Sequence, residues 1–404
     1  MHEVGQRDVF RVISLLRSDI AEVIEYAGIS SHVCFMSITT KQQPARVILG
    51  MSGGVDSSVA AHLLLRQGHV VEGLFMKNWE EDDGTEYCTA LQDLADAQRV
   101  CDQMDIKLHT ANFAAEYWDN VFEDFLLDYR AGHTPNPDVL CNREIKFKQF
   151  VAYAERLGGD FIATGHYARS HGRGDDYRLC KGTDHNKDQS YFLQAVPRTQ
   201  LQKCLFPLGA WDKGEVRKLA ADLGLHNHAR KDSTGICFIG ERRFADFLER
   251  YIDDRPGEIV DENRRHIGEH RGLHLYTIGQ RQGMNIGGVR GRAEAPWYVA
   301  AKLNATHTLV VTQDPSLLNG EWLRATDTNW LLDVPLPVSC SAKIRYRQAD
   351  QDCTVQNAAD GKLLIRFERP QRAITPGQFV AFYDGDVMLG GARIQHADTN
   401  IRLT

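Results

Sequence analysis

The sequence predicts an α/β protein in which a parallel sheet is followed by a smaller antiparallel β domain. Hydrophobic runs and helical segments alternate from residue 46 to residue 164, which is the pattern of successive βαβ units. After about residue 255, short runs separated by Gly and Pro replace that alternation and indicate antiparallel strands. The 404 residues exceed what one ordinary hydrophobic core accommodates, so two or three domains are expected.

Four strands and four helices are expected in the first region. The strands are short apolar runs, and the helices carry their apolar residues at a spacing of three or four. The predicted strands are 46–51, 70–76, 106–110 and 160–164, and the predicted helices are 55–67, 91–104, 116–130 and 146–157. Two further helices are expected at 213–223 and 242–251. Ligands of such a sheet bind at the carboxyl ends of its strands.

The second region is expected to form a small barrel, because its short runs have regular turn signals and no helical period. Its predicted strands are 297–301, 308–312, 343–346, 363–367 and 379–383.

Residues 1–45 stand apart from both regions. Their apolar residues between 9 and 24 predict an amphipathic helix that ends at Gly28. The segment is too charged for a signal-peptide core and too acidic for a typical transit peptide. We expect an extension outside the native product, with Met36 as an alternative start.

Composition indicates a soluble globular protein of the cytoplasm. With 43% hydrophobic residues the chain can offset its ordering entropy, which excludes large-scale disorder. No stretch reaches the roughly 18 to 20 uncharged apolar residues of a membrane span. The nine cysteines include no CxxC pair, so neither zinc nor an iron–sulfur cluster is expected. In a reducing cytoplasm a distinctive cysteine is more often reactive than structural.

The net charge of −7 is distributed unevenly. Residues 72–138 contain 16 Asp and Glu against 4 Lys and Arg, so the remainder of the chain is net basic. Residues 264–292 contain six arginines and one glutamate. Arginine suits phosphate well, but charge alone leaves open whether this surface binds a polyanion or is simply solvated.

A glycine-rich segment, SGGVDSS at 52–58, follows the first predicted strand and opens a helix. Glycines there allow close backbone approach, and the free N–H groups of the helix start bind phosphate oxygens. The segment is neither a Walker A loop nor a GxGxxG motif. An ordinary capped turn needs fewer such residues, so a phosphate-binding loop is the better interpretation. It resembles the PP-loop of the ATP pyrophosphatases, which split ATP to AMP and pyrophosphate while adenylating a substrate.

Four further segments distinguish among the PP-loop families. They are GLFMKNWEEDD at 73–83, TPNPDVLCN at 134–142, TGHY at 164–167 with KDQSYF at 187–192, and DSTGICFIG at 232–240. Together with KIRYR at 343–347 and TPGQ at 375–378, they are similar to the tRNA-specific 2-thiouridylase family. The resemblance runs from about residue 46 to 391 and implies thiolation of the wobble uridine of tRNA.

The resemblance implies a PP-loop, adenine nucleotide alpha hydrolase-like and Rossmann-like fold in three domains. They are an ATP-binding catalytic domain at 46–243, a small central tRNA-binding or adaptor domain at 244–300 and a C-terminal antiparallel β-barrel at 301–404. ATP would be held by Gly50, Met51, Ser52, Gly53, Gly54, Val55, Asp56, Ser57, Ser58, Met76 and Gly165. The tRNA positions would be Asn136, Pro137, Asp138, His166, Lys187, Asp188, Gln189, Arg345, Tyr346 and Gln378.

Cys141 takes the nucleophile position of the family and Cys237 the persulfide position. Both have basic neighbours that favour a thiolate and are expected at loop or strand ends. Cys34 lies in the N-terminal extension. The remaining cysteines are expected to be small buried hydrophobic residues: Cys88, Cys101, Cys180, Cys204, Cys340 and Cys353. His166, Lys187 and Arg345 could equally be ordinary structural or surface residues without the family context.

The chemistry of thiolation explains these residue types. The C2 oxygen of uridine is a poor leaving group until AMP is attached to it, which requires ATP with Mg²⁺. A persulfide on Cys237 supplies sulfur, and Cys141 attacks its inner sulfur, leaving a Cys141–Cys237 disulfide. Whether persulfide or released hydrosulfide attacks the uridine stays open. Asp138 is a candidate general acid or base.

Other functions remain as alternatives. A PP-loop synthetase that adenylates a small metabolite would need neither two reactive cysteines nor a basic β domain, and a non-catalytic tRNA-binding relative would not need the intact loop. The expected partners are tRNAs of the Lys, Glu and Gln type and a sulfur-donor protein, either a desulfurase or a relay protein. No membrane partner is expected, and the protein is expected to be a monomer.

Overall fold

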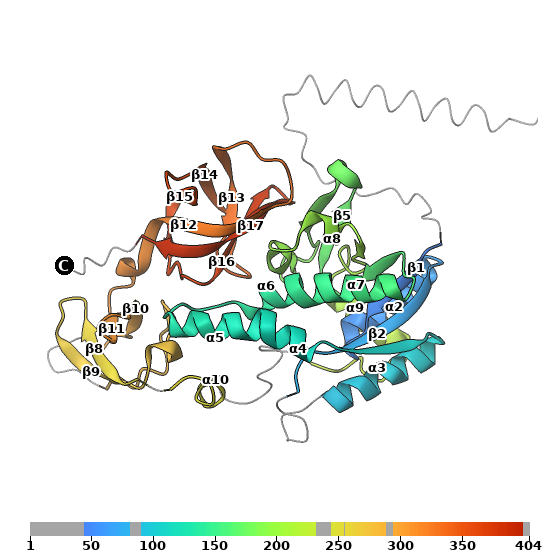
Figure 1. Ribbon diagram of the computed structural model, residues 1–404, viewed down its shortest axis with the longest axis horizontal. Helices are drawn as coiled ribbons and strands as arrows, with labels where there is room; N and C mark the ends of the chain where they lie inside the picture. Colours follow the sequence, from blue (N-terminus) through green and yellow to red (C-terminus); the bar gives the residue numbers. More distant parts are fainter. Residues whose placement is uncertain (1–43, 81–89, 232–243, 254, 288–293, 399–404) are drawn as a thin grey trace, which may run out of the picture. The chain divides into compact units, whose positions relative to one another are not determined.

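The computed structural model describes residues 44–80, 90–231, 244–253, 255–287 and 294–398 (Figure 1). The predicted N-terminal helix, Cys88 and the persulfide position Cys237 lie outside these described residues.

A five-stranded parallel sheet forms the first part of the fold, in the order β3-β2-β1-β4-β7. Apolar side chains of β1 point alternately to its two faces, where Val47 and Leu49 join one hydrophobic cluster and Ile48 joins another. Burial on both faces explains the continuous apolar run in the sequence. The strands are β1 (Arg46–Gly50), β2 (Val70–Lys77), β3 (Leu108–Asn112), β4 (Phe161–Ala163) and β7 (Cys204–Leu205).

Most helices of this region occupy the predicted places; one predicted helix begins earlier, and the short helix α8 was not predicted. They are α2 (Val55–Arg66), α3 (Ala90–Met104), α4 (Ala114–Tyr117), α5 (Glu123–Arg130), α6 (Pro137–Cys141), α7 (Phe150–Arg156), α8 (Arg198–Leu201) and α9 (Lys213–Asp222). Two π-helical stretches, η1 (Trp118–Phe122) and η2 (Asn142–Gln149), connect α4 to α5 and α6 to α7. The helix predicted at 146–157 therefore begins earlier, at Pro137, whose fixed φ suits the first helical position.

A four-stranded sheet of order β10-β11-β8-β9 follows α10 (Phe244–Leu248). Strands β8 and β11 are parallel, and the other two pairings are antiparallel. Its apolar residues form two small clusters of their own, around Val299 and around Val310. The strands are β8 (Gly257–Asp261), β9 (His266–His270), β10 (Tyr298–Leu303) and β11 (Thr308–Thr312).

Six antiparallel strands form a closed barrel, drawn in orange and red in Figure 1. Its order is β12-β15-β14-β13-β16-β17, and the pairing of β12 with β17 closes the ring. The predicted fold class, a PP-loop-type parallel-sheet domain with a central domain and a C-terminal antiparallel barrel, is confirmed. The strands are β12 (Asn319–Trp330), β13 (Val338–Lys343), β14 (Gln351–Asn357), β15 (Leu363–Arg372), β16 (Phe379–Asp384) and β17 (Val387–Ala397).

Three features of the second region differ from the predictions. The runs 297–301 and 308–312 were expected in the barrel, but they form β10 and β11 of the separate four-stranded sheet. The run 343–346 was predicted as a strand, but β13 ends at Lys343 and the chain turns through Arg347, which has a φ of +64°. A hairpin from the first region, β5 (Ala168–His171) and β6 (Arg178–Lys181), also joins the barrel sheet, because β6 pairs with β17 at Cys180 and Val387.

None of the helices in the described part of the chain is long and apolar enough to cross a membrane.

Candidate active site

The glycine-rich loop lies between β1 and α2, at the carboxyl end of the parallel sheet. Gly53 has a φ of +76°, and a Cβ there would lie 2.5 Å from the carbonyl oxygen of Asp93 on α3. Only glycine fits both the backbone conformation and the space. The loop then enters α2 at Gly54, so the first N–H groups of this helix are available to bind phosphate oxygens.

The structure brings the predicted ATP-binding residues together from three strand ends. A Cβ on Gly50 would lie 3.4 Å from Cε of Met76, so the ends of β1 and β2 meet there. A Cβ on Gly165, after β4, would lie 3.2 Å from Cβ of Asp56. These short approaches place Met76, Gly165 and the loop together at the edge of the sheet where ligands bind.

Asp56 is held by two residues to which we had assigned no role from the sequence. Lys213 Nζ lies 2.7 and 2.8 Å from the two carboxylate oxygens, and the hydroxyl of Tyr167 donates to Oδ1 at 2.8 Å. Tyr167 belongs to the TGHY motif, which was a usable signal. Lys213 lies 157 residues from Asp56, and nothing around it in sequence distinguishes it from a surface lysine.

A second pair of unassigned residues fixes the loop from the other side. Asn227 donates to the carbonyl oxygen of Gly53 at 2.8 Å and to Oγ of Ser58 at 2.9 Å. Arg230 forms ion pairs with Asp93 and Asp96 on α3, the helix against which Gly53 packs. The segment 227–230 therefore ties the loop to α3.

Asp138 and Cys141 are three residues apart on α6 and so lie on one side of the helix. Cys141 is buried, with 2% of its surface exposed. The prediction that Cys141 lies at a loop or strand end is wrong, because Pro137 starts a helix that continues through it. Immediately after Cys141 the helix widens into η2, and such π-helical turns often occur at functional sites.

Burial governs the protonation of two residues in this neighbourhood. It raises the pKa of the Asp138 carboxyl, and the charge of Lys146 on η2 partly opposes the shift. It lowers the pKa of His166 to about 3, and the same lysine contributes. His166 is therefore neutral at ordinary pH, and its Nδ1 lies 2.8 Å from Oγ1 of Thr164. A carboxyl with a raised pKa is suited to moving a proton near neutral pH.

Asn136 and Gln378, two predicted tRNA positions, meet although 242 residues separate them. The side chain of Asn136 donates to Oε1 of Gln378 at 3.5 Å. Gln378 in turn donates to the carbonyl oxygens of Thr134 and Pro135 at 2.8 and 3.1 Å. A barrel residue thus holds the chain that leads into α6.

The predicted tRNA segment 187–189 forms a turn before a short 3-10 helix, η4 (Ser190–Leu193). Gln189 exchanges hydrogen bonds with the backbone of Tyr167, which links this turn to the residue that holds Asp56. The side chain of Asp188 points inward and is 3% exposed. It therefore shapes the turn and does not present its carboxylate to solvent.

Arg345 and Tyr346 lie in the turn after β13. Arg345 donates to the carbonyl oxygen of Ala373 at 2.5 Å and lies 3.3 Å from Oγ1 of Thr375. The ring of Tyr346 packs on Phe192 of η4, with 4.5 Å between centroids, and the guanidinium of Arg347 lies over the ring. The aromatic and basic groups expected for RNA contact are therefore adjacent.

Most of the other cysteines are buried as expected. Cys101, Cys180, Cys204 and Cys353 are buried, and Cys340 is half-buried. Burial raises the pKa of the Cys101 thiol to about 12, so this thiol is unreactive at neutral pH. Within the described ranges no group of three or more His, Cys, Asp or Glu side chains is arranged to hold a metal ion.

Three family models match the chain in succession. They are a tRNA methyl transferase HUP domain at residues 45–241, a tRNA methyl transferase PRC-barrel domain at 245–313 and an aminomethyltransferase beta-barrel domain at 321–394. A tRNA-specific 2-thiouridylase MnmA of Stutzerimonas stutzeri is 58% identical over 369 residues, which are 90% of this chain and 98% of the relative. Another, of Pseudomonas aeruginosa, is 59% identical over 87% of this chain and 95% of the relative. The chain belongs to the tRNA-specific 2-thiouridylase family.

Membership of the 2-thiouridylase family confirms the family, the enzyme class and the tRNA-modifying function predicted from the sequence. The alternative, a PP-loop synthetase of small metabolites, is not supported. Similar solved structures include an NMN synthetase from Francisella tularensis (18% identity, TM-score 0.30, 47% of this chain and 67% of that chain). A 4-thiouridine synthetase–RNA complex with bound ATP is 17% identical, with a TM-score of 0.32, over 51% of this chain and 49% of that chain.

Proposed function

We propose that the protein uses ATP to adenylate the C2 oxygen of the wobble uridine of tRNA and then replaces that oxygen with sulfur. The products are 2-thiouridine, AMP and pyrophosphate. The observation that carries the proposal is the joint arrangement of a tight glycine loop at a helix start and of Asp138 and Cys141 on α6. Membership of the 2-thiouridylase family supplies the substrate class.

ATP binds at Gly50–Ser58, with Met76 and Gly165 beside it. The N–H groups at the start of α2 take the phosphates, and Mg²⁺ accompanies the triphosphate and neutralises its charge. Lys213 balances the carboxylate of Asp56, so that this acidic group can lie beside the nucleotide without repelling it.

Sulfur comes from a persulfide on Cys237. In one order, the outer sulfur of the persulfide attacks the adenylated C2 and AMP departs; the thiolate of Cys141 then attacks the inner sulfur, so that the bond between the two sulfurs breaks, the thiolated uridine is released and a Cys141–Cys237 disulfide forms. In the other order, Cys141 attacks the inner sulfur first, which forms the disulfide and frees hydrosulfide, and the hydrosulfide attacks C2 and displaces AMP. An external dithiol then reduces the disulfide. Asp138, with its raised pKa, acts as general acid or base.

The remaining proposals concern partners and location. Asn136, Pro137 and Asp138 contact the target base, and the other positions involved in RNA binding are His166, Lys187–Gln189, Arg345, Tyr346 and Gln378. The substrates are tRNAs for Lys, Glu and Gln, a desulfurase or relay protein loads Cys237, and the protein acts as a cytoplasmic monomer.

The test is thiolation of unmodified tRNA with ATP, Mg²⁺ and a persulfide donor, read by nucleoside mass spectrometry. The wild type should form 2-thiouridine, and Cys141→Ser and Cys237→Ser should lower its formation by at least about 10³-fold while ATP binding persists. Cys340→Ser, at a half-buried barrel position, is the matched control and should stay active. Thiolation that survives in Cys237→Ser would refute the persulfide route. AMP formation with a small metabolite and no thiolated nucleoside would refute the substrate class.

A further inference from the structure

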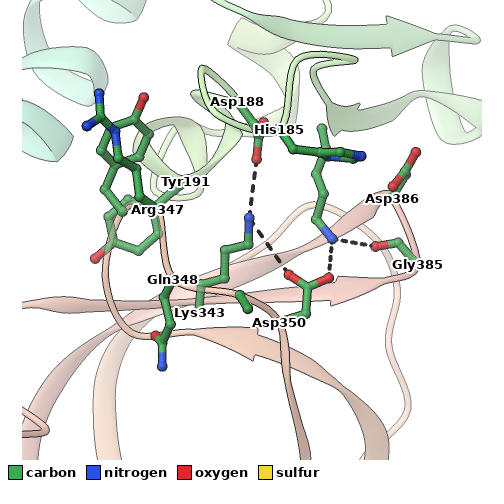
Figure 2. Close-up of a pocket in the computed structure, with 12 residues that line it drawn as sticks. His185, Asp188, Tyr191, Lys343, Arg347, Gln348, Asp350, Gly385 and Asp386 are labelled. Carbon is green, nitrogen blue, oxygen red and sulfur yellow. Dashed lines mark hydrogen bonds and ion pairs between the residues drawn. The ribbon is translucent and has the colours of Figure 1, made fainter. Parts of the chain in front are cut away.

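A network of two lysines and two aspartates joins the hairpin and turn of the first region to the barrel (Figure 2). We call Lys181, Asp188, Lys343 and Asp350 the lysine network. Figure 2 shows Lys343 pointing between Asp188 and Asp350. The network borders a cavity of about 430 Å³, which Tyr346 and Arg347 also line.

Asp350 bridges the two lysines. Its Oδ2 lies 2.5 Å from Nζ of Lys181, and its Oδ1 lies 3.8 Å from Nζ of Lys343. Lys181 also donates to the carbonyl oxygen of Gly385 at 2.8 Å. Both ammonium groups lie over the ring of Tyr383, at 4.5 and 5.5 Å from its centre. The two charges are therefore fixed by several partners each.

Asp188 connects the lysine network to the predicted tRNA-contacting turn. One carboxylate oxygen accepts hydrogen bonds from the backbone of Gly182 and Ser190, at 3.0 and 3.1 Å, on either side of the turn. The other lies 3.4 Å from Nζ of Lys343. Lys343 is the last residue of β13, two residues before Arg345. The ammonium group of Lys343 therefore links the turn 184–189 to the turn 345–347.

Ion pairs between largely buried side chains are an inefficient way to stabilise a fold. The side chains of Lys181 and Lys343 are 6% and 12% exposed, and removing a charge from water costs several kcal/mol before pairing recovers it. Apolar residues of similar volume would hold two elements together at least as well. The charged groups instead fix how the two elements are placed relative to each other, because each group needs its partners at fixed positions.

We propose that Lys343, Lys181 and Asp350 are positioning residues for tRNA, which hold the turns 184–189 and 345–347 in the relative placement that the RNA requires. None of the three has to touch the RNA. This inference rests on the proposed function, because it names how the same RNA-contacting surface is assembled.

Replacement of Asp350 distinguishes a role in positioning the two turns from a general effect of charge on RNA binding. Asp350→Asn removes a negative charge near the RNA surface, which by charge alone would strengthen RNA binding. If the network positions the turns, the KM for tRNA should instead rise about tenfold, the effect of displacing one RNA contact, while kcat and the KM for ATP change little. Asp352→Asn, an exposed carboxylate on β14, makes the same charge change and is the matched control.

Lys343→Met provides the second variant. Its charge control is Lys362→Met, at a half-buried barrel lysine that pairs with Asp360. The KM for tRNA should rise in Lys343→Met more than in the control, and its effect should be less than additive with Asp350→Asn. Thermal unfolding shows whether each variant is folded at the assay temperature.

Three results have distinct meanings. An unchanged or lower tRNA KM in folded Asp350→Asn overturns the inference. Equal effects of Lys343→Met and Lys362→Met overturn it as well, because they show a general charge effect. No 2-thiouridine from the wild type refutes the proposed function itself and is recognised before any variant is compared.

Discussion

At the scale of single residues, backbone fit and burial determine how the nucleotide loop and its neighbours behave. Gly53 combines a positive φ with contact against α3, whereas Gly68 has a φ of +87° and open space around it. The two glycines therefore separate the cost of backbone conformation from the cost of a clash.

Gly53→Ala should lose most ATP binding and be destabilised by more than Gly68→Ala. The second change costs only the left-handed conformation, about 1 to 2 kcal/mol. The first adds displacement of α3, because the new Cβ would overlap the carbonyl oxygen of Asp93. Urea unfolding and ATP titration measure both quantities. Equal destabilisation of the two variants would contradict the packing argument.

His166 should make the folded state less stable in acid. Because burial lowers its pKa to about 3, the folded protein does not take up the proton that the unfolded chain gains below pH 6.5. This contribution is fully present above pH 6.5 and is lost as the pH falls toward 3. At pH 5 the loss is about 2 kcal/mol.

The measurement is urea unfolding of the wild type and of His166→Gln at pH 8 and pH 5. The variant should lose about 2 kcal/mol less than the wild type between these values. His266→Gln, at an exposed position, is the control. The same pH dependence in His166→Gln and the wild type would contradict a neutral buried imidazole.

At the scale of elements, helix starts place the functional side chains. Helix α9 begins at Lys213 behind a capping box, in which Asp212 accepts from the backbone of the first turn and Glu215 accepts from the N–H of Asp212. This cap fixes the first helical residue, and that residue carries the ammonium group that pairs with Asp56.

Asp212→Ala should destabilise the protein by about 1 kcal/mol and weaken ATP binding as well. Asp222→Ala, at the far end of the same helix, should change neither quantity by much, since an acidic residue there has no cap to lose. Chemical denaturation and nucleotide titration provide the readouts. A loss of stability with unchanged ATP affinity would show that Lys213 does not act through Asp56.

Local patterns predicted the elements around the nucleotide loop, because β1 and α2 carry their own periodicity and turn signals. The hairpin β5–β6 had no such signal: its strands are short and mostly polar, and its partner β17 lies some two hundred residues away. The strand predicted at 343–346 was wrong because the alternating apolar residues Ile344 and Tyr346 lie beyond Lys343, where β13 ends and the chain turns. Lys213 and Asn227 were missed because they are distant from the nucleotide loop in sequence, and only the tertiary fold brings them to it.

At the scale of the whole molecule, charge is divided between an acidic segment and a net basic remainder. Residues 72–138 carry most of the acidic excess and include β3 and α5. The predicted RNA contacts at Lys187 and Arg345 lie outside this segment. The total of −7 therefore says little about the surface that meets RNA.

Affinity for tRNA should fall steeply with salt, although the protein is acidic overall. Raising NaCl from about 50 to about 200 mM should weaken tRNA binding by roughly tenfold or more, because bound counterions are released when basic groups contact phosphates. ATP affinity, at a fixed free Mg²⁺ concentration, should change far less. Fluorescence titration measures both. A tRNA affinity that does not vary with salt would argue against the basic contacts.

The pairing of β6 with β17 also bears on how the chain is made. The nucleotide loop and the partners that hold it have all been synthesised once Arg230 is in place, so this half can fold while the ribosome is still translating the rest. Until Val387 emerges, however, the outer edge of β6 has no partner strand. An unpaired strand edge is a template for wrong association. The nascent protein is therefore most vulnerable to aggregation after its first domain has folded and before its last strand is synthesised.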